Sequence, residues 1–187
     1  NQAGGSTGSG LSSGEGSGGA IETFGKGTAS LTNDTIAANS VGGPIGAPTG
    51  AGAAGGGLYA GTPTSLLNDT VDGNAVIGTG SGGDIEGASA TISLKNTIVS
   101  AGGATTGPNC TGKVSSAGHN IDDGTSAECE LHAVLGDMVT APLLGSLENN
   151  GGPTQTQALL TGSPAINAGE NAGCPITDQR GVQRPAG

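Results

Sequence analysis

Apolar positions along the chain come in short runs that recur in a fixed order. Glycine pairs at residues 18–19, 56–57 and 82–83 each open a short strand-like stretch, and a second stretch follows eight to ten residues later. The second stretches read SLTNDTI at 30–36, SLLNDTV at 65–71 and SLKNTI at 93–98, the last one residue shorter. Outside residues 127–138 no segment sustains a 3.6-residue period, so the pattern predicts repeated short strands rather than helices.

Repeats of this length predict an all-β solenoid of parallel strands, with corner-loop insertions where the spacing changes. The Asn positions of the repeat are 35 and then 28 residues apart, and a Gly-, Ala- and Pro-rich tract at 44–55 supplies the predicted insertion. Each coil is too thin to bury its apolar side alone, so equivalent side chains should stack in columns. The expected columns are Leu31, Leu66 and Leu94; Ile36, Val71 and Ile98; and Ile21, Leu58 and Ile85.

A structural ladder of asparagines is expected at one corner of the solenoid. Its members are Asn33, Asn68 and Asn96. Asn tolerates left-handed backbone, and its amide can bond to the next coil. Glycine pairs should serve the other corners, where a positive φ is required.

Composition sharpens this picture and removes several function classes. The chain of 187 residues holds 40 Gly and 9 Pro, a content typical of disorder, yet the repeat assigns most of them to corners and leaves residues 1–17 as a partly ordered lead-in. With no Trp, one Tyr, one Phe and a net charge of −10, the chain is unsuited to nucleic acid. No apolar run reaches the roughly 20 residues that a membrane span needs, so no membrane insertion is expected.

The three cysteines suggest an oxidising compartment. Cys110 and Cys129 bracket a Gly-, Ser- and Asp-rich segment, as a disulfide that closes a surface loop would. Cys174 is left over, so its expected partner lies outside the chain, on another chain or past Gly187. Neither the cysteines nor the two histidines have the spacing of a zinc site.

Carboxylates provide the candidate chemistry. Asp34 and Asp69 occupy equivalent repeat positions, so their side chains should lie about 5 Å apart. Such a pair could act as general acid and base, with Asp84 as a further candidate, or could bind calcium. Asp122 and Asp123 are a second calcium candidate. The pair belongs to a repeated structural motif, and the third coil has no counterpart to it. The sequence therefore favours aspartates that are solvated at a corner of the solenoid. We expect no catalytic residue and no resident cofactor.

The last forty residues carry the most specific pattern. They read PLLG at 142–145, NNGGPTQTQALL at 149–160, GSPAINAG at 162–169 and DQRGVQRP at 178–185. In this order the blocks resemble the C-terminal signature of choice-of-anchor Q domain proteins, which are bacterial surface or secreted proteins, and the upstream repeats are similar to those of polymorphic outer-membrane proteins. The resemblance implies a right-handed parallel β-helix and an extracellular or cell-surface location. That family continues with a Cys-containing block, which would supply the partner of Cys174.

The sequence therefore predicts a single β-helix domain over residues 18–187. Its expected parts are repeat coils at 18–103, a Cys-bracketed insertion at 104–140 and C-terminal coils at 141–187. The expected function is a non-catalytic, structural or adhesin-like segment of a surface or secreted bacterial protein, which could assemble into filaments or contact cell-surface glycans. The alternative is a polysaccharide lyase or glycoside hydrolase built on the same scaffold.

Overall fold

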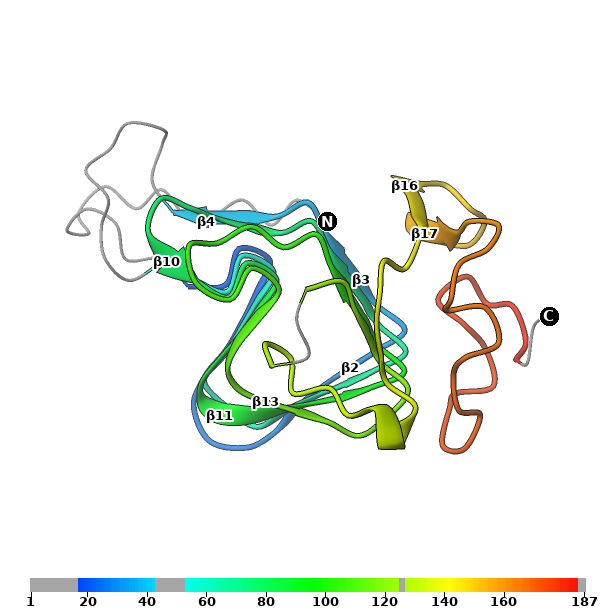
Figure 1. Cartoon of the computed structure of the whole chain (residues 1–187), viewed down its shortest axis with the longest axis horizontal. Helices are drawn as coiled ribbons and strands as arrows, with labels where there is room; N and C mark the ends of the chain where they lie inside the picture. Colours follow the sequence, from blue (N-terminus) through cyan, green and yellow to red (C-terminus); the bar gives the residue numbers. More distant parts are fainter. Residues whose placement is uncertain (1–16, 43–52, 125–126, 185–187) are drawn as a thin grey trace.

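A computed structural model of the chain describes residues 17–42, 53–124 and 127–184. The predicted lead-in at 1–17, except Ser17, and the tract at 44–55, except its last three residues, lie outside this description. The described part is all-β, with parallel strands that follow superimposed paths around a common core (Figure 1). The prediction of an all-β fold with parallel strands is confirmed.

Two larger parallel sheets carry most of the strands. The first contains β1 (Ile21–Thr23), β2 (Ala29–Thr32), β6 (Leu58–Ala60), β7 (Thr64–Leu67), β11 (Ile85–Lys95) and β13 (Cys110–Ser116). The second contains β3 (Thr35–Ala37), β8 (Thr70–Asp72), β12 (Ile98–Ser100), β14 (Ile121–Asp122) and β15 (Met138–Val139). We call one passage of the chain through these sheets a rung, so that β1–β4, β6–β9, β11–β12 and β13–β14 form rungs one to four.

Two short parallel pairs complete the rungs. β4 (Ser40–Gly42) pairs with β9 (Ala75–Ile77), and β5 (Ala53–Ala54) pairs with β10 (Gly80–Ser81). Ser40 and its partner Ala75 are 35 residues apart in the sequence, whereas Ala54 and its partner Ser81 are 27 residues apart. The eight additional residues of the first repeat therefore lie between β4 and β5, where the sequence places the corner insertion.

The register confirms two of the three predicted columns and corrects the third. Leu31 and Leu94 both pair with Leu66, and Ile21 and Ile85 both pair with Leu58. In the remaining column, Val71 pairs with Val99, whereas Ile98 pairs with Thr70 and faces outward. The expectation that the third repeat is one residue shorter was wrong. Thr97 occupies the position of Asp69, so Ile98 is equivalent to Thr70 and Val99 to Val71.

The core is narrow and consists of small aliphatic residues from the inward positions of each rung. Its fully buried members include Leu58, Leu66, Ile85, Ile92, Leu94, Val71 and Val99. Between the rungs, backbone N–H groups donate to carbonyls of the neighbouring rung, so backbone polar groups are satisfied without large side chains. This arrangement explains how a chain with so few large apolar residues builds an ordered core.

One corner depends on glycine in every rung. Gly18, Gly55, Gly82 and Gly107 have φ of 65°, 67°, 64° and 55° at equivalent positions, where L residues are strained. At the next position the rungs approach so closely that a Cβ on Gly19 would lie 2.0 Å from the carbonyl oxygen of Gly56. The positive φ predicted for the glycine corners is confirmed, but the pair in the second rung is 55–56 and not 56–57, and the fourth rung carries Pro108 at the second position.

The structure places strands inside the segment at 104–140 that the sequence assigns to an insertion. β13 pairs with β11 and β14 pairs with β12, both in parallel, so this segment supplies a fourth rung. The sequence signal was missed because His119 and Asn120 replace the Asn and Asp of the earlier corners. Chemically different residues thus occupy the same structural positions.

Residues 141–184 do not continue the parallel sheets, which corrects the prediction of C-terminal coils. β16 (Leu144–Glu148) and β17 (Thr156–Leu159) form an antiparallel hairpin, and turns follow it. A 3-10 turn, η1 (Ala133–Leu135), precedes β15. Figure 1 shows the orange and red end of the chain beside the sheet that contains β3.

Candidate functional site

A corner with left-handed backbone precedes each strand of the second sheet. It is formed by Asn33, Asn68, Asn96, His119 and Gly136, with φ of 61°, 59°, 50°, 59° and 81°. Asn96 Nδ2 donates to Asn68 Oδ1 of the neighbouring rung at 3.0 Å. The predicted asparagine ladder thus has the expected backbone conformation and one of the expected inter-rung amide bonds, and His119 extends it by a further rung.

Asp34 and Asp69 follow this corner in adjacent rungs, and their carboxylates bond to the backbone. Asp69 Oδ1 accepts the N–H of Asp34 at 2.7 Å, and its Oδ2 accepts the N–H of Leu67 at 2.9 Å. Asp34 Oδ2 accepts the N–H of Thr32 at 3.1 Å. Both carboxylates therefore tie the corner together, as asparagine and serine side chains do in turns.

Burial raises the pKa of Asp69 to about 7, and the nearby charge of Asp34 acts in the same direction. The two N–H bonds to Asp69 oppose this shift but do not outweigh burial. Asp69 is only 2% exposed, whereas Asp34 faces solvent. The Asp69 carboxyl, whose pKa is raised, is thus one that a polymeric substrate could not reach.

Asp84 lies at the glycine corner of the third rung and does not join this pair. Its Oδ1 accepts Asn74 Nδ2 at 2.7 Å and the Asn74 backbone N–H at 3.0 Å, while Asn74 Oδ1 accepts Asn39 Nδ2 at 2.9 Å. Asp84 is fully buried, and burial raises its pKa well above the ordinary value. The structure therefore brings Asp34 and Asp69 together and keeps Asp84 in a separate polar chain inside the core.

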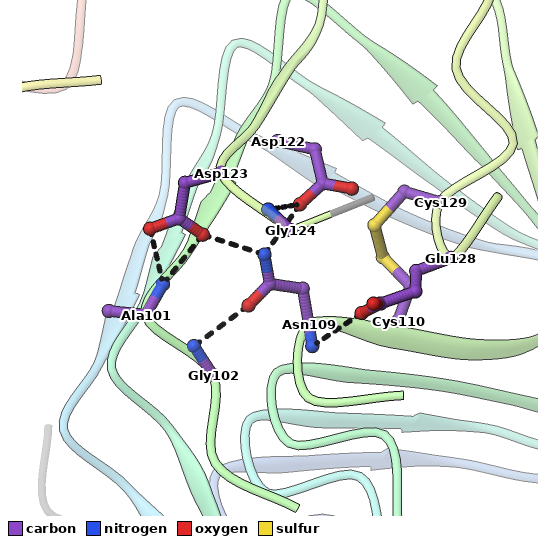
Figure 2. Close-up of a disulfide and its surroundings, with 9 residues drawn as sticks. All are labelled: Ala101, Gly102, Asn109, Cys110, Asp122, Asp123, Gly124, Glu128 and Cys129. Carbon is purple, nitrogen blue, oxygen red and sulfur yellow. Dashed lines mark hydrogen bonds between the residues drawn. A yellow bond between two sulfur atoms is a disulfide. The ribbon is translucent and has the colours of Figure 1, made fainter. Parts of the chain in front are cut away.

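The Cys110–Cys129 disulfide is formed, as predicted, and a third polar cluster lies beside it (Figure 2). At its centre, Asn109 Nδ2 donates to Asp122 Oδ1 and to Asp123 Oδ1, the latter at 2.8 Å, and Asn109 Oδ1 accepts the Gly102 N–H at 2.9 Å. An amide donor thus occupies the space between the two carboxylates. Burial raises the pKa of Asp122, whose Oδ2 has no hydrogen-bond partner among the described residues.

None of these clusters has the donor set of a metal centre. Across residues 17–42, 53–124 and 127–184, no group of three or more His, Cys, Asp and Glu side chains is arranged to hold a metal ion. The calcium candidates also separate into two places, with Asp34 and Asp69 at one corner and Asp122 and Asp123 beside the disulfide. Calcium binding stays a prediction that these contacts do not test.

Residues 165–184, which we call the C-terminal strap, run along the asparagine corner from the fourth rung back to the first. His119 Nδ1 is hydrogen-bonded to the Ala168 carbonyl at 2.8 Å. Asn96 exchanges bonds with Glu170, and Lys95 forms an ion pair with Glu170 at 2.8 Å. At the far end, Asn33 Nδ2 donates to the Thr177 carbonyl at 3.0 Å. The strap therefore binds to side chains that the left-handed corners project outward.

Cys174 belongs to this strap and is a free thiol in the described part of the chain. Its Sγ lies 3.3 Å from Asn68 Oδ1 and 3.2 Å from Asn96 Nδ2. The residue predicted to seek a partner outside the chain is thus half-buried against the asparagine ladder.

Between the strap and the outer face of the second sheet lies a cleft of about 660 Å³. Its floor is one register position in four successive rungs, occupied by Thr35, Thr70, Ile98 and Ile121. Arg180 and Arg184, the two arginines of the chain, contribute to its walls. The cleft is not predictable from the sequence, because nothing in the local pattern indicates that the C-terminal residues fold back across the rungs.

Comparisons with protein-family models, with curated proteins and with solved structures find no match to this chain. Among the described residues, no helix is long and apolar enough to cross a membrane.

Proposed function

We propose that the parallel sheets form a right-handed β-helix that acts as a non-catalytic, adhesin-like scaffold. The observation that carries this proposal is the use of the polar side chains at the corners: Asp34, Asp69 and Asn74 all bond to the backbone of a strand end or of a neighbouring rung. Side chains engaged in this way stiffen the stack and are not free to move protons on a substrate. Stacked rungs with saturated corners give a rigid support for the surfaces they carry.

An extracellular or cell-surface location in a bacterium fits the same proposal. The Cys110–Cys129 disulfide is of a kind that persists in oxidising environments. The resemblance of the C-terminal blocks to choice-of-anchor Q domain proteins points to the same compartment. Expression with and without export to the periplasm, followed by thiol counting, tests this point, since one free thiol is expected after export and three in a reducing cytoplasm.

Self-association through a sheet edge is the assembly that we propose, and a filament is its extended form. β1 and β2 lie at the end of the first sheet and have no partner on their outer side within the described residues. At the opposite end, Cys129 and Leu131 pack into the core and cover the last rung. Because an unpaired parallel edge is a template for another strand, self-association should use the first rung.

Sedimentation and electron microscopy across a concentration series test the scaffold and its assembly. If the first rung pairs between copies, an elongated dimer is expected, because both copies use the same edge; particles that keep lengthening with concentration require the covered end to open and pair as well. A single monomeric species at every concentration would remove the filament, although it would leave a monomeric scaffold in place.

A polysaccharide assay separates the scaffold from the enzyme alternative. The purified chain, Asp34→Ala and Asp69→Ala are incubated with acidic and neutral polysaccharides, and new reducing ends are counted. No product is expected from any of the three proteins. Product from the parent chain that disappears in either variant would overturn the scaffold proposal and favour a lyase or hydrolase.

A further inference from the structure

The cleft under the C-terminal strap contains both arginines of an acidic protein, together with the carboxyl groups of Asp69, Glu170 and Asp178, and Arg180 is ion-paired with Asp178. The chain has a net charge of −10 and two arginines, and both line this one cleft. Arg180 donates from Nε and Nη2 to the same oxygen of Asp178, at 2.9 and 2.8 Å. Arg184 donates from Nη1 to the Thr177 carbonyl. Within the described residues, Arg180 Nη1 and Arg184 Nε and Nη2 have no hydrogen-bond partner, so guanidinium donors are left for a ligand.

The floor of the cleft has a polar end and an apolar end. Thr35 and Thr70 supply hydroxyls in the first two rungs, and Ile98 supplies aliphatic surface in the third, while Ile121 closes the end of the floor as a buried residue. With about 4.8 Å between strands, the floor is roughly 14 Å long. Thr35 donates to Gln179 Oε1 of the strap at 2.7 Å, which places the arginine-bearing part of the strap at the polar end.

Amide groups add hydrogen-bonding capacity to the walls. Gln157 Nε2 donates to Asp72 Oδ2 at 2.7 Å, and Gln157 Oε1 has no partner among the described residues. Asn68 Nδ2 is likewise a buried donor without a partner in the part of the chain that the structure describes. Because unpaired buried polar groups are costly, such groups favour a ligand with several hydroxyls.

We propose that this cleft binds a carboxylate-bearing sugar, a hexuronate residue of an acidic glycan. The carboxylate would pair with Arg184, which has no carboxylate partner among the described residues, the hydroxyls would meet the Thr and Gln side chains, and a C–H face of the ring would lie on Ile98. A planar guanidinium suits a carboxylate because two N–H groups can bond to its two oxygens. The inference rests on the proposed adhesin-like function and names the ligand class of one of its surfaces.

Two competing ligand chemistries fit the cleft less well. A fatty acid would satisfy the arginines, but its acyl chain would leave Thr70, Gln157 and the other wall amides without partners. A polyanion such as nucleic acid would meet repulsion from the acidic surface over many charges. One carboxylate at the guanidinium groups gains a short-range contact, whereas repulsion beyond about 10 Å is screened at 0.1 M salt. The cleft volume of about 660 Å³ lies in the range of small-molecule sites.

Titration calorimetry with trigalacturonate as the probe tests the proposal. Arg184→Gln should weaken binding roughly tenfold or more, since it removes charge-assisted hydrogen bonds. Lys113→Gln, the matched control, removes the same charge from an exposed position on β13 and should change binding less than about twofold. Because Arg184→Gln also removes the bond to Thr177, Thr70→Phe serves as a second variant that fills the floor and keeps both arginines.

Thermal unfolding of each variant establishes that it is folded before its binding is interpreted. The proposal is supported if trigalacturonate binds the parent chain, and if both cleft variants lose binding while Lys113→Gln does not. It is overturned if trigalacturonate does not bind, if neutral trigalactose, octanoate or triglutamate binds as tightly, or if Lys113→Gln loses as much affinity as Arg184→Gln. A chain that assembles and cleaves no polysaccharide but ignores trigalacturonate would refute this ligand and leave the scaffold proposal intact.

Discussion

At the scale of single residues, the chain uses carboxylates and amides as structural connectors. Asp69, Thr97, Asn120 and Asp137 occupy the same register position in successive rungs and are all buried. Asn120 Oδ1 accepts the Thr97 N–H at 2.9 Å, as Asp69 Oδ1 accepts that of Asp34. Where the position carries Asp or Asn the side chain accepts the N–H of the neighbouring rung, whereas Thr97 donates its hydroxyl to the Lys95 carbonyl. An amide can therefore replace an acid at this position, which makes the titration of the buried acids measurable by substitution.

The stability of the protein should fall as pH rises through neutrality. The pKa of Asp69 is raised by burial to about 7 from an ordinary 3.8, and burial also raises the pKa of Asp84 and Asp122. A raised pKa means that the folded state holds a proton that the unfolded chain releases, so this stabilisation is full below pH 3.8 and is lost as pH rises through about 7. For Asp69 the effect is on the order of 4 kcal/mol at most.

Urea unfolding between pH 4 and pH 8 measures this effect, and Asp69→Asn should flatten the dependence. The variant keeps the acceptor for the Asp34 N–H, as Asn120 does for Thr97. Asp34→Asn, which changes the exposed carboxylate one rung away, is the matched control. An identical pH profile for the parent chain and Asp69→Asn would show that Asp69 does not carry the proton.

Ala38 is strained in a way that glycine would relieve. It has a φ of 56° at the corner where the second rung carries Gly73 with a φ of 64°. A left-handed alanine costs roughly 1–2 kcal/mol, whereas glycine loses about 0.5–1 kcal/mol to chain entropy. Ala38→Gly should therefore raise the free energy of unfolding by about 0.5–1 kcal/mol in urea melts. The reverse substitution, Gly73→Ala, should lower it, and equal melts for all three proteins would contradict the strain argument.

At the scale of elements, the asparagine corner links the sheets to the C-terminal strap. The side chain of Asn96 bonds to the Asn68 side chain, to the backbone N–H and carbonyl of Glu170 and to the Cys174 thiol. Since the strap binds to corners and not through a strand ladder, its attachment depends on a few side chains. The strap should therefore open more easily than the sheets it covers.

Replacing Asn96 separates its role in the left-handed backbone of the corner from its role in attaching the strap. Asn96→Gly keeps the left-handed backbone and removes the side-chain bonds, so hydrogen exchange at residues 168–174 should accelerate while β7 and β8 stay protected. Asn96→Ala removes the same bonds and adds roughly 1–2 kcal/mol of backbone strain, which should also appear in the global stability. If exchange in the strap is unchanged in both variants, Asn96 does not anchor it.

Features set by residues close in the sequence could be predicted, whereas features set by contacts between distant segments could not. Leu31, Leu66 and the three ladder asparagines repeat with their neighbours, so local pattern alone predicts their columns and their positive φ. The fourth rung was missed because His119 and Asn120 fulfil the same backbone role with different chemistry. The cleft was missed because Arg184 approaches the second sheet only through contacts between distant segments, such as Asn33 with Thr177.

At the scale of the whole molecule, the rungs form a nearly one-dimensional stack with different ends. The first rung presents unpaired edges among the described residues, whereas the last full rung is covered by the loop that Cys129 anchors. In such a stack each rung gains stability from its neighbours, so the ends should open before the middle. The disulfide lies where it can delay this opening at the C-terminal end of the stack.

Removal of the disulfide should therefore destabilise the strands at the C-terminal end of the stack before it destabilises the other strands. The bond closes a loop between residues 19 positions apart, which corresponds to about 3 kcal/mol of chain entropy. In the Cys110→Ala/Cys129→Ala double variant, hydrogen exchange should accelerate first in β13, β14 and β15, while β2 and β7 keep their protection. Reductant should reproduce this pattern in the parent chain and have no effect on the double variant. A uniform acceleration across all strands would instead show that the rungs unfold as one unit, because loss of the end then destabilises every strand equally.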